Sequence, residues 1–523
     1  TWIAIGASIF ASNIGSEHLI GLAGAGASSG MAMAHWEIQG WMILILGWVF
    51  VPFYSRSMVY TMPEFLERRY NPQSRTILSV ISLVSYVLTK VAVTVYAGGL
   101  VFQQVFGIKE LWGIDFFWIA AIGLVVLTAL YTIFGGMKSV LYTSVLQTPI
   151  LLLGSLIILV LGFKELGGWD EMMRVCGAVT VNDYGDTMTN LIRSNDDANF
   201  PWLGALIGSA IIGFWYWCTD QFIVQRVLSG KNEKEARRGT IFGAYLKLLP
   251  VFLFLIPGMI AFALHQKYIG AGGEGFLPML ANGTANADAA FPTLVAKLLP
   301  AGVKGLVVCG ILAALMSSLA SLFNSSAMLF TIDFYKRFRP ETPEKKLVGI
   351  GQIATVVIVI LGILWIPIMR SVGDVLYTYL QDVQSVLAPG IAAAFLLGIC
   401  WKRTSAQGGM WGLIAGMIIG LTRLGAKVYY SNAGEVADST FKYLFYDMNW
   451  LFFCGWMFLF CIIVVIVVSL ATEAPTAEKI QGLVFGTATK EQKAATRASW
   501  DHWDIIHTVI ILAITGAFYW YFW

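Results

Sequence analysis

The chain has 523 residues, of which 57% are hydrophobic and only 12% are charged. Soluble domains carry about twice that share of charged residues, so the composition excludes a soluble globular protein. The net charge of +3 at pH 7 is too small to favour nucleic-acid binding, and the six cysteines show no C-x-x-C spacing that would suggest a metal site or a disulfide framework. We therefore expect a polytopic, all-α membrane protein.

Apolar runs of roughly twenty residues, long enough to cross a lipid bilayer, recur along the chain. They predict spans at residues 2–29, 37–54, 76–106, 113–134, 140–163, 201–228, 240–266, 303–334, 347–369, 374–400, 407–425, 448–471 and 504–522. Lys and Arg gather in the loops that follow the even-numbered spans, as Arg68 and Arg69 do after the second. By the positive-inside rule these loops and the start of the first span are cytoplasmic, and the C-terminus is outside.

Two groups of five spans form the predicted halves of the protein. Residues 1–163 make the first half and residues 201–400 the second, with an extracellular loop at 164–200 between them and three additional helices at 401–523. An odd number of spans in each half inverts the second half relative to the first. The first half begins with an interrupted span and the second with another polar span, which is rich in aromatic residues. Inverted repeats with broken first helices are typical of transporters.

Polar residues interrupt the first span between residues 11 and 21. Because polar atoms in hydrocarbon need partners, we predict a broken helix whose unwound carbonyls hold a cation. Candidate ligands are the carbonyls of Ala11, Ile14 and Ala314 and the hydroxyls of Ser317 and Ser318. This set of neutral oxygens suits Na⁺ better than a divalent ion. A packing role for the serines stays open, since membrane helices favour small residues.

A candidate solute site is formed by polar and aromatic residues that lie within or beside apolar spans: Asn13, His18, Glu37, Trp217, Lys247 and Gln381. A buried Lys and a buried Glu each need a partner or an aqueous cavity. Mixed hydrogen-bond donors and acceptors beside aromatic faces suit the hydroxyls and the C–H faces of a sugar or polyol. The sequence leaves open that Glu37 and Lys247 are members of a structural ion pair.

Tyr216 and Tyr377 lie close to these polar positions and are candidate lids that shut water out on either side of the solute. Tyr and Trp also form belts at the membrane surface, which is the alternative interpretation.

Four stretches of the sequence resemble the sodium/solute symporter family, and within it the sodium/glucose cotransporters: GASIFASNIGS at 6–16, WYWCTDQFIVQR at 215–226, SSLAS at 317–321 and the segment 387–403. The resemblance implies a leucine-transporter-type 5+5 inverted-repeat core, and one further helix before Thr1. It implies the same sodium and sugar ligands as above. It also places the inner gate at Tyr216 and the outer gate at Leu22, Trp36 and Tyr377.

Two departures from the family pattern affect this prediction. Ser144 stands where many members have an Asp that supports a second sodium, so we predict one sodium per sugar. Gly40 and Gly213 stand where relatives offer polar side chains, which leaves the solute open.

The predicted function is sodium-coupled import of a hexose, glucose or galactose, by alternating access in a plasma membrane, which we expect to be a bacterial inner membrane. Its partners are the sugar, sodium and the bilayer. The alternatives are myo-inositol or another family solute, or a transporter-like sensor. An enzyme is not expected, because the sequence shows neither a clustered metal site nor a nucleophile–base pair.

Overall fold

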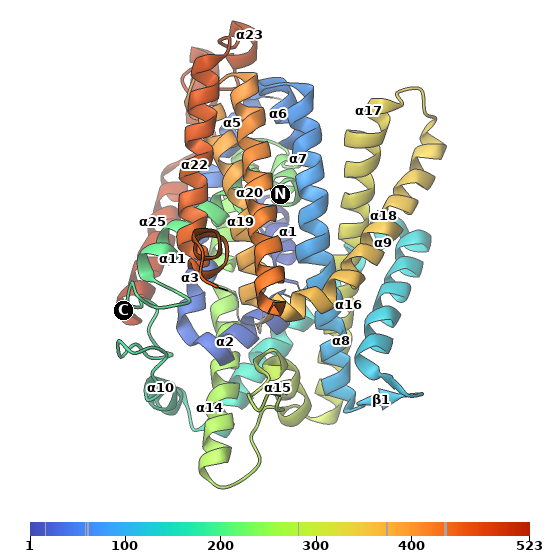
Figure 1. The fold of residues 1–523 in the computed structure, drawn as a ribbon, viewed down its shortest axis with the longest axis vertical. Coiled ribbons are helices and arrows are strands. Elements are labelled where there is room, and N and C mark those ends of the chain that lie inside the picture. The colour runs from blue at the N-terminus through green and yellow to red at the C-terminus, as the bar shows by residue number, and fades with distance from the viewer. Residues whose placement is uncertain (16, 58, 60–61, 281, 373–374, 434–436) are drawn as a thin grey trace.

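The computed structural model describes the chain except residues 16, 58, 60–61, 281, 373–374 and 434–436, and without the side chains of residues 131, 133–148, 225, 324 and 370–372. The described chain is a helical bundle with one small antiparallel hairpin, β1 (Glu110–Leu111) and β2 (Ile114–Asp115) (Figure 1). The helices that build the bundle are α1 (Trp2–Asn13), α2 (Ala23–Ser29), α4 (Gly40–Ile45), α5 (Val51–Ser57), α7 (Pro72–Ser85), α8 (Ala92–Phe106), α9 (Phe116–Leu166), α11 (Trp202–Gly213), α13 (Glu233–Leu246), α14 (Ile256–Gly270), α16 (Ala301–Met328), α18 (Glu344–Val372), α19 (Leu376–Cys400), α20 (Ala406–Asn432), α22 (Trp450–Ala471) and α25 (His502–Tyr521).

Within the described residues, 11 helical segments are long and apolar enough to cross a membrane. Two shorter apolar helices, Trp2–Asn13 and Phe116–Leu130, account for the predicted spans that these segments do not cover. The prediction of a polytopic helical membrane protein is confirmed. Backbone hydrogen bonds explain the choice of fold, because a helix satisfies all of its own donors and acceptors in hydrocarbon.

The first helix is broken where the sequence predicts the break. Helix α1 ends at Asn13, and Ile14 is extended, with φ −86° and ψ 103°. The chain resumes as a π-helical turn, η1 (Glu17–Leu22), which leads into α2. This unwinding frees backbone groups next to Asn13 and His18, and unwound backbone at this depth is tolerated only where it is buried in protein or lines a cavity.

Close packing of glycine faces fixes both parts of the broken helix. A Cβ atom on Gly6 of α1 would lie 2.5 Å from the Phe242 ring of α13. A Cβ atom on Gly26 of α2 would lie 2.2 Å from the carbonyl oxygen of Leu255, just before α14, and one on Gly258 would lie 1.9 Å from the carbonyl oxygen of Ala23. Glycine lets these backbones approach each other, as is common in membrane helices.

Helix α9 differs from the prediction. The sequence predicts two spans, 113–134 and 140–163, with a short loop between them, whereas Phe116–Leu166 is one helical element with Pro149 inside it. Residues of loop-like composition do not have to break a membrane helix, because the helix keeps its backbone hydrogen bonds internal. Ser144, on which the one-sodium prediction depends, lies among the side chains outside the described residues.

The loops separate to the two ends of the bundle (Figure 1). The Lys- and Arg-rich loops carry α6 (Met62–Arg69), α17 (Lys336–Phe338) and α23 (Ala477–Ile480) at one end, and α10 (Trp169–Gly177) and α15 (Ala290–Leu298) lie at the other. The backbone N–H of Leu191, in the segment 164–200, donates to the carbonyl of Phe522 at 2.8 Å. The C-terminus therefore lies at the end that the sequence predicts to be extracellular.

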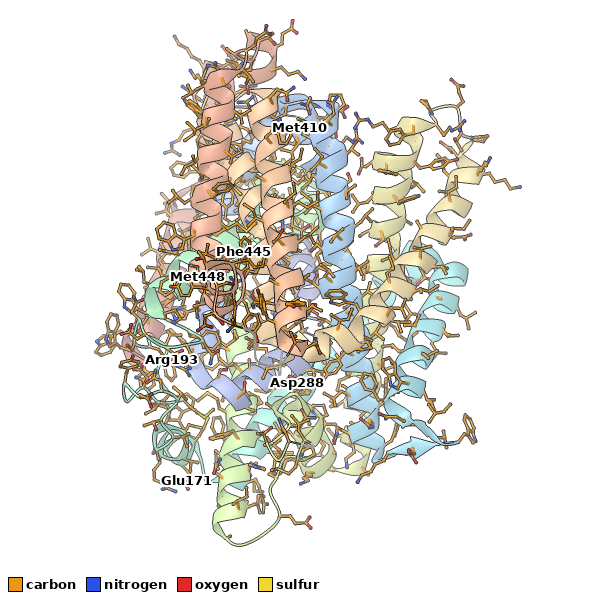
Figure 2. The ribbon with its side chains drawn as sticks, viewed as in Figure 1. Glu171, Arg193, Asp288, Met410, Phe445 and Met448 are labelled. Atoms are coloured by element: carbon orange, nitrogen blue, oxygen red, sulfur yellow. The ribbon has the colours of Figure 1, made fainter. Side chains whose placement is uncertain are left out.

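Asp288 joins the outer loop to two core helices. Figure 2 shows it beside α2, and its carboxylate lies close to Gly24. Both carboxylate oxygens lie 3.1 Å from the backbone N–H of Leu376, the first residue of α19. This contact fixes the start of the helix that carries Tyr377 and Gln381.

Candidate functional site

A cavity lies between the break in the first helix, the turn before α4, the π-helical segments η4 (Tyr86–Val91) and η5 (Phe214–Thr219), and α19. The predicted residues that line it are Asn13, His18, Trp36, Tyr216, Trp217, Lys247, Tyr377 and Gln381. The structure thus brings together most of the predicted solute site and three of the four predicted gate residues, although they come from distant parts of the chain.

Glu37 is at the centre of the polar network behind this cavity. Its carboxylate is fully buried and lies 2.6 Å from Lys247 Nζ and 3.4 Å from His18 Nε2. The hydroxyl of Tyr377 donates to its second oxygen. Because an unpaired buried charge is strongly destabilising, this pairing explains how the apolar core holds a carboxylate and an ammonium group. The structural ion pair that the sequence left open is therefore present, and it lies beside the cavity.

Several polar atoms of the lining residues have no hydrogen-bond partner among the described residues. Asn13 Nδ2 and His18 Nε2 lie 3.3 Å apart, which leaves His18 Nδ1 without a partner. Trp36 Nε1 and Gln381 Oε1 are also buried and unpartnered. Buried polar atoms normally have partners, so these are positions where solute hydroxyls can complete the hydrogen bonding.

Aromatic rings form two opposite parts of the site. The Trp217 ring lies 5.4 Å from Lys247 Nζ and meets the Tyr216 ring edge-on at 5.0 Å. Lys90 Nζ lies 5.3 Å from the centre of the Tyr216 ring. On the other side, Trp36 stacks on Trp450 with ring centres 5.5 Å apart. Leu22, the fourth predicted gate residue, is fully buried in the core and is not among the cavity-lining residues.

The predicted sodium ligands are divided between two helices with different neighbours. Helix α1, with Ala11, packs against α13 and α12 (Gln221–Leu228). Helix α16, with Ala314, Ser317 and Ser318, packs against α9, α18 and α8. Among the described residues, α1 and α16 do not form an extended contact. The set of sodium ligands, Ile14 included, stays a prediction.

The structure adds polar lining residues that sequence reasoning missed: Glu17, Gln39, Thr89, Lys90 and Gln384. Gln384 lies three residues after Gln381 on α19, so helical spacing could have identified it. Gln39 follows Glu37 by two residues, a spacing that would place it on the opposite face of a regular helix. Gly213 lines the cavity, whereas Gly40 packs against α13: a Cβ atom at position 40 would lie 3.0 Å from the carbonyl oxygen of Ala244.

Comparison with known proteins identifies the family. The model of the sodium:solute symporter family matches residues 1–416. The chain belongs to this family. Human sodium/myo-inositol cotransporter 2 is 36% identical over 499 residues, covering 93% of this chain and 73% of that protein. The sodium/myo-inositol cotransporter of Canis lupus familiaris is 37% identical over 508 residues, covering 93% and 70%.

The fold of this chain is similar to the solved structure of a Na⁺-coupled sialic acid symporter, with a TM-score of 0.67 and 22% sequence identity. The match covers 91% of this chain and 90% of that one. The predictions of family, of a leucine-transporter-type fold and of Na⁺ as the coupling ion are confirmed. The protein is a sodium-coupled symporter of a small solute, and its relatives are transporters rather than enzymes.

Proposed function

We propose that this symporter imports a neutral polyol with a six-membered ring, either myo-inositol or a hexose, together with one Na⁺ per solute. The observation that carries the proposal is the charge balance at the cavity. Glu37 and Lys247 neutralise each other at 2.6 Å, while His18 Nδ1, Trp36 Nε1 and Gln381 Oε1 are polar atoms that have no partner among the described residues. The lining residues Glu17 and Lys90 also carry opposite charges, so the site as a whole has no net charge that would attract a charged solute, and it favours an uncharged solute rich in hydroxyls.

The choice between the two polyols depends on different observations. The names of relatives that are 36% and 37% identical support myo-inositol. The Trp217 ring, which offers a flat apolar face, and the Asn13–His18 pair support the hexose that the sequence predicts. Both solutes present several hydroxyls around one ring, so the same donors and acceptors serve either.

The proposed cycle uses the predicted sodium ligands and the predicted gate residues. Na⁺ binds between the unwound end of α1 and the serines of α16, draws these two segments together and orders Asn13 and His18. The solute then binds, the outer residues Trp36 and Tyr377 close over it, and release proceeds past Tyr216. A membrane potential of 100 mV contributes about 2.3 kcal/mol for each charge that crosses.

Uptake into proteoliposomes tests the proposal. Labelled myo-inositol, glucose, galactose, sialic acid and proline are each offered with an inward Na⁺ gradient, and again with K⁺ in place of Na⁺. We expect sodium-dependent accumulation of at least one of the three polyols, and competition by the same polyol without label. Accumulation of sialic acid or proline instead, with no polyol uptake, would contradict the proposed solute and leave the family assignment intact.

A further inference from the structure

Gln39 reaches the cavity because the helix is interrupted directly after Glu37. Helix α3 (Ala34–Glu37) ends at Glu37, and α4 begins at Gly40. Two residues in a regular helix that are two positions apart point in nearly opposite directions. The turn at Ile38 and Gln39, with ψ of 18° and 26°, removes this restriction. Glu37 and Gln39 can therefore serve the same site.

The side chain of Gln39 is buried and held in one position. It is 2% exposed, and its Nε2 donates to the carbonyl oxygen of Ser209 on α11 at 2.8 Å. Its Oε1 accepts no hydrogen bond from any described residue, and Gln39 is one of the residues that line the cavity. One end of the amide is thus anchored, and the other end is available to a donor such as a solute hydroxyl.

Gly213 makes room for this amide. A Cβ atom at position 213 would lie 2.6 Å from Gln39 Oε1 and 3.1 Å from Gln39 Cδ. The amide therefore occupies the place of a side chain at 213, and both residues line the same cavity. Gly213 itself offers no side chain to the cavity, and the amide from the α3–α4 turn lies in that place instead.

We propose that the Gln39 amide contacts the solute and determines specificity, and that Gly213 is required because it leaves space for that amide. This inference rests on the proposed function, since it names the group that binds one hydroxyl of the polyol. The alternative role is structural, in which Gln39 only ties the α3–α4 turn to α11 through the Ser209 carbonyl.

Four variants separate these roles, and one of them combines Gln39→Ala with Gly213→Ala. Gln39→Ala removes the amide. Gly213→Ala keeps the amide but displaces it, because the clash is with the free end of a flexible side chain. The double variant Gln39→Ala/Gly213→Ser places a hydroxyl in the space that the amide vacates. Gly425→Ala on α20 is the matched control, since a Cβ atom there meets nothing within 4 Å.

The readout is KM for Na⁺-driven uptake of myo-inositol, glucose, galactose, sialic acid and proline, and for deoxy analogues of whichever polyol is transported. We expect each single variant to raise KM about tenfold, the size expected for one lost hydrogen bond. The double variant Gln39→Ala/Gly213→Ala should have a KM only slightly above that of either single variant, because both changes remove the same contact. The Ser double variant should recover part of the loss, and the half-saturating Na⁺ concentration should stay unchanged.

The deoxy analogues identify the contact itself. One analogue should bind the wild type about tenfold more weakly than the parent solute and bind Gln39→Ala equally well. Two results would overturn the inference. One is that the effects of Gln39→Ala and Gly213→Ala on KM are additive in the double variant. The other is that every deoxy analogue raises KM by the same factor in the wild type and in Gln39→Ala. If the wild type transports sialic acid or proline instead of a polyol, the proposed function fails. The KM values of the single and double variants, measured with that solute, still decide the role of Gln39.

Discussion

Replacing Lys247 by Met should destabilise the protein more than removing both members of its ion pair. Lys247 Nζ lies 2.6 Å from Glu37 Oε2, and the two side chains are 4% and 0% exposed. Without the ammonium group, the buried carboxylate keeps only the Tyr377 hydroxyl and the more distant His18 Nε2 at 3.4 Å. Removing one partner of a buried pair costs about 3–5 kcal/mol, because it leaves an uncompensated charge.

The double variant Lys247→Met/Glu37→Gln removes both charges and retains an amide that can accept from Tyr377. Replacing a buried pair by neutral groups is often close to neutral for stability. The apparent melting temperature of the detergent-purified protein should therefore fall clearly for Lys247→Met and recover most of the loss in the double variant. Sodium-driven uptake should be lost in both variants, because both lack the ammonium group of Lys247, which is one of the proposed solute ligands.

Two results would refute this reasoning. A Lys247→Met protein that melts at the wild-type temperature would show that Glu37 does not depend on Lys247. A double variant that melts no higher than the single variant would show that the loss comes from packing rather than from the unpaired carboxylate.

Three further predictions concern single sites. Gln381→Ala should raise the KM for solute by about tenfold or more while the melting temperature stays near wild type, since its Oε1 has no partner among the described residues; an unchanged KM in the uptake assay would remove Gln381 from the site. Ser318→Ala should shift the sodium-activation curve to higher Na⁺, because it deletes one proposed ligand, and an unchanged curve would reject that ligand. Burial raises the pKa of Asp288 from 3.8 to about 7, so the folded state holds the proton more tightly than the unfolded state, and the resulting stability is present at low pH and lost as the pH rises towards 7. Asp288→Asn should therefore flatten the fall in melting temperature over that range, and a slope equal to that of wild type would contradict the assignment.

The sequence predicts the break in the first helix because its cause is local. Polar residues between Ala11 and Gly21 cannot lie in a lipid-facing helix, so interruption follows from the residues themselves. The spans follow in the same way from hydropathy and length. The continuous α9 is the exception, because a short polar segment between two apolar runs can either form a loop or remain helical.

The sequence predicts a solute site because Asn13, His18, Lys247 and Gln381 are polar residues in apolar surroundings. Gln39 has the same property, but its orientation depends on the turn at Ile38 and Gln39. Gly40 directly follows that turn, yet a glycine in a membrane helix indicates close packing equally well. The relation between Gln39 and Gly213 is a contact between residues 174 positions apart, and no local pattern contains such information. Placing the sodium ligands likewise requires knowing how α1 and α16 approach each other, which hydropathy does not determine.

The most direct test of the account is the accumulation of labelled polyol at steady state in sealed proteoliposomes with a fixed Na⁺ gradient and a fixed membrane potential. A tenfold gradient contributes about 1.4 kcal/mol and a potential of 100 mV about 2.3 kcal/mol per Na⁺. One Na⁺ per solute therefore predicts accumulation that rises to, and does not exceed, about 500-fold. Accumulation that does not depend on the Na⁺ gradient, or that exceeds about 500-fold, would contradict one-to-one coupling of sodium to a polyol.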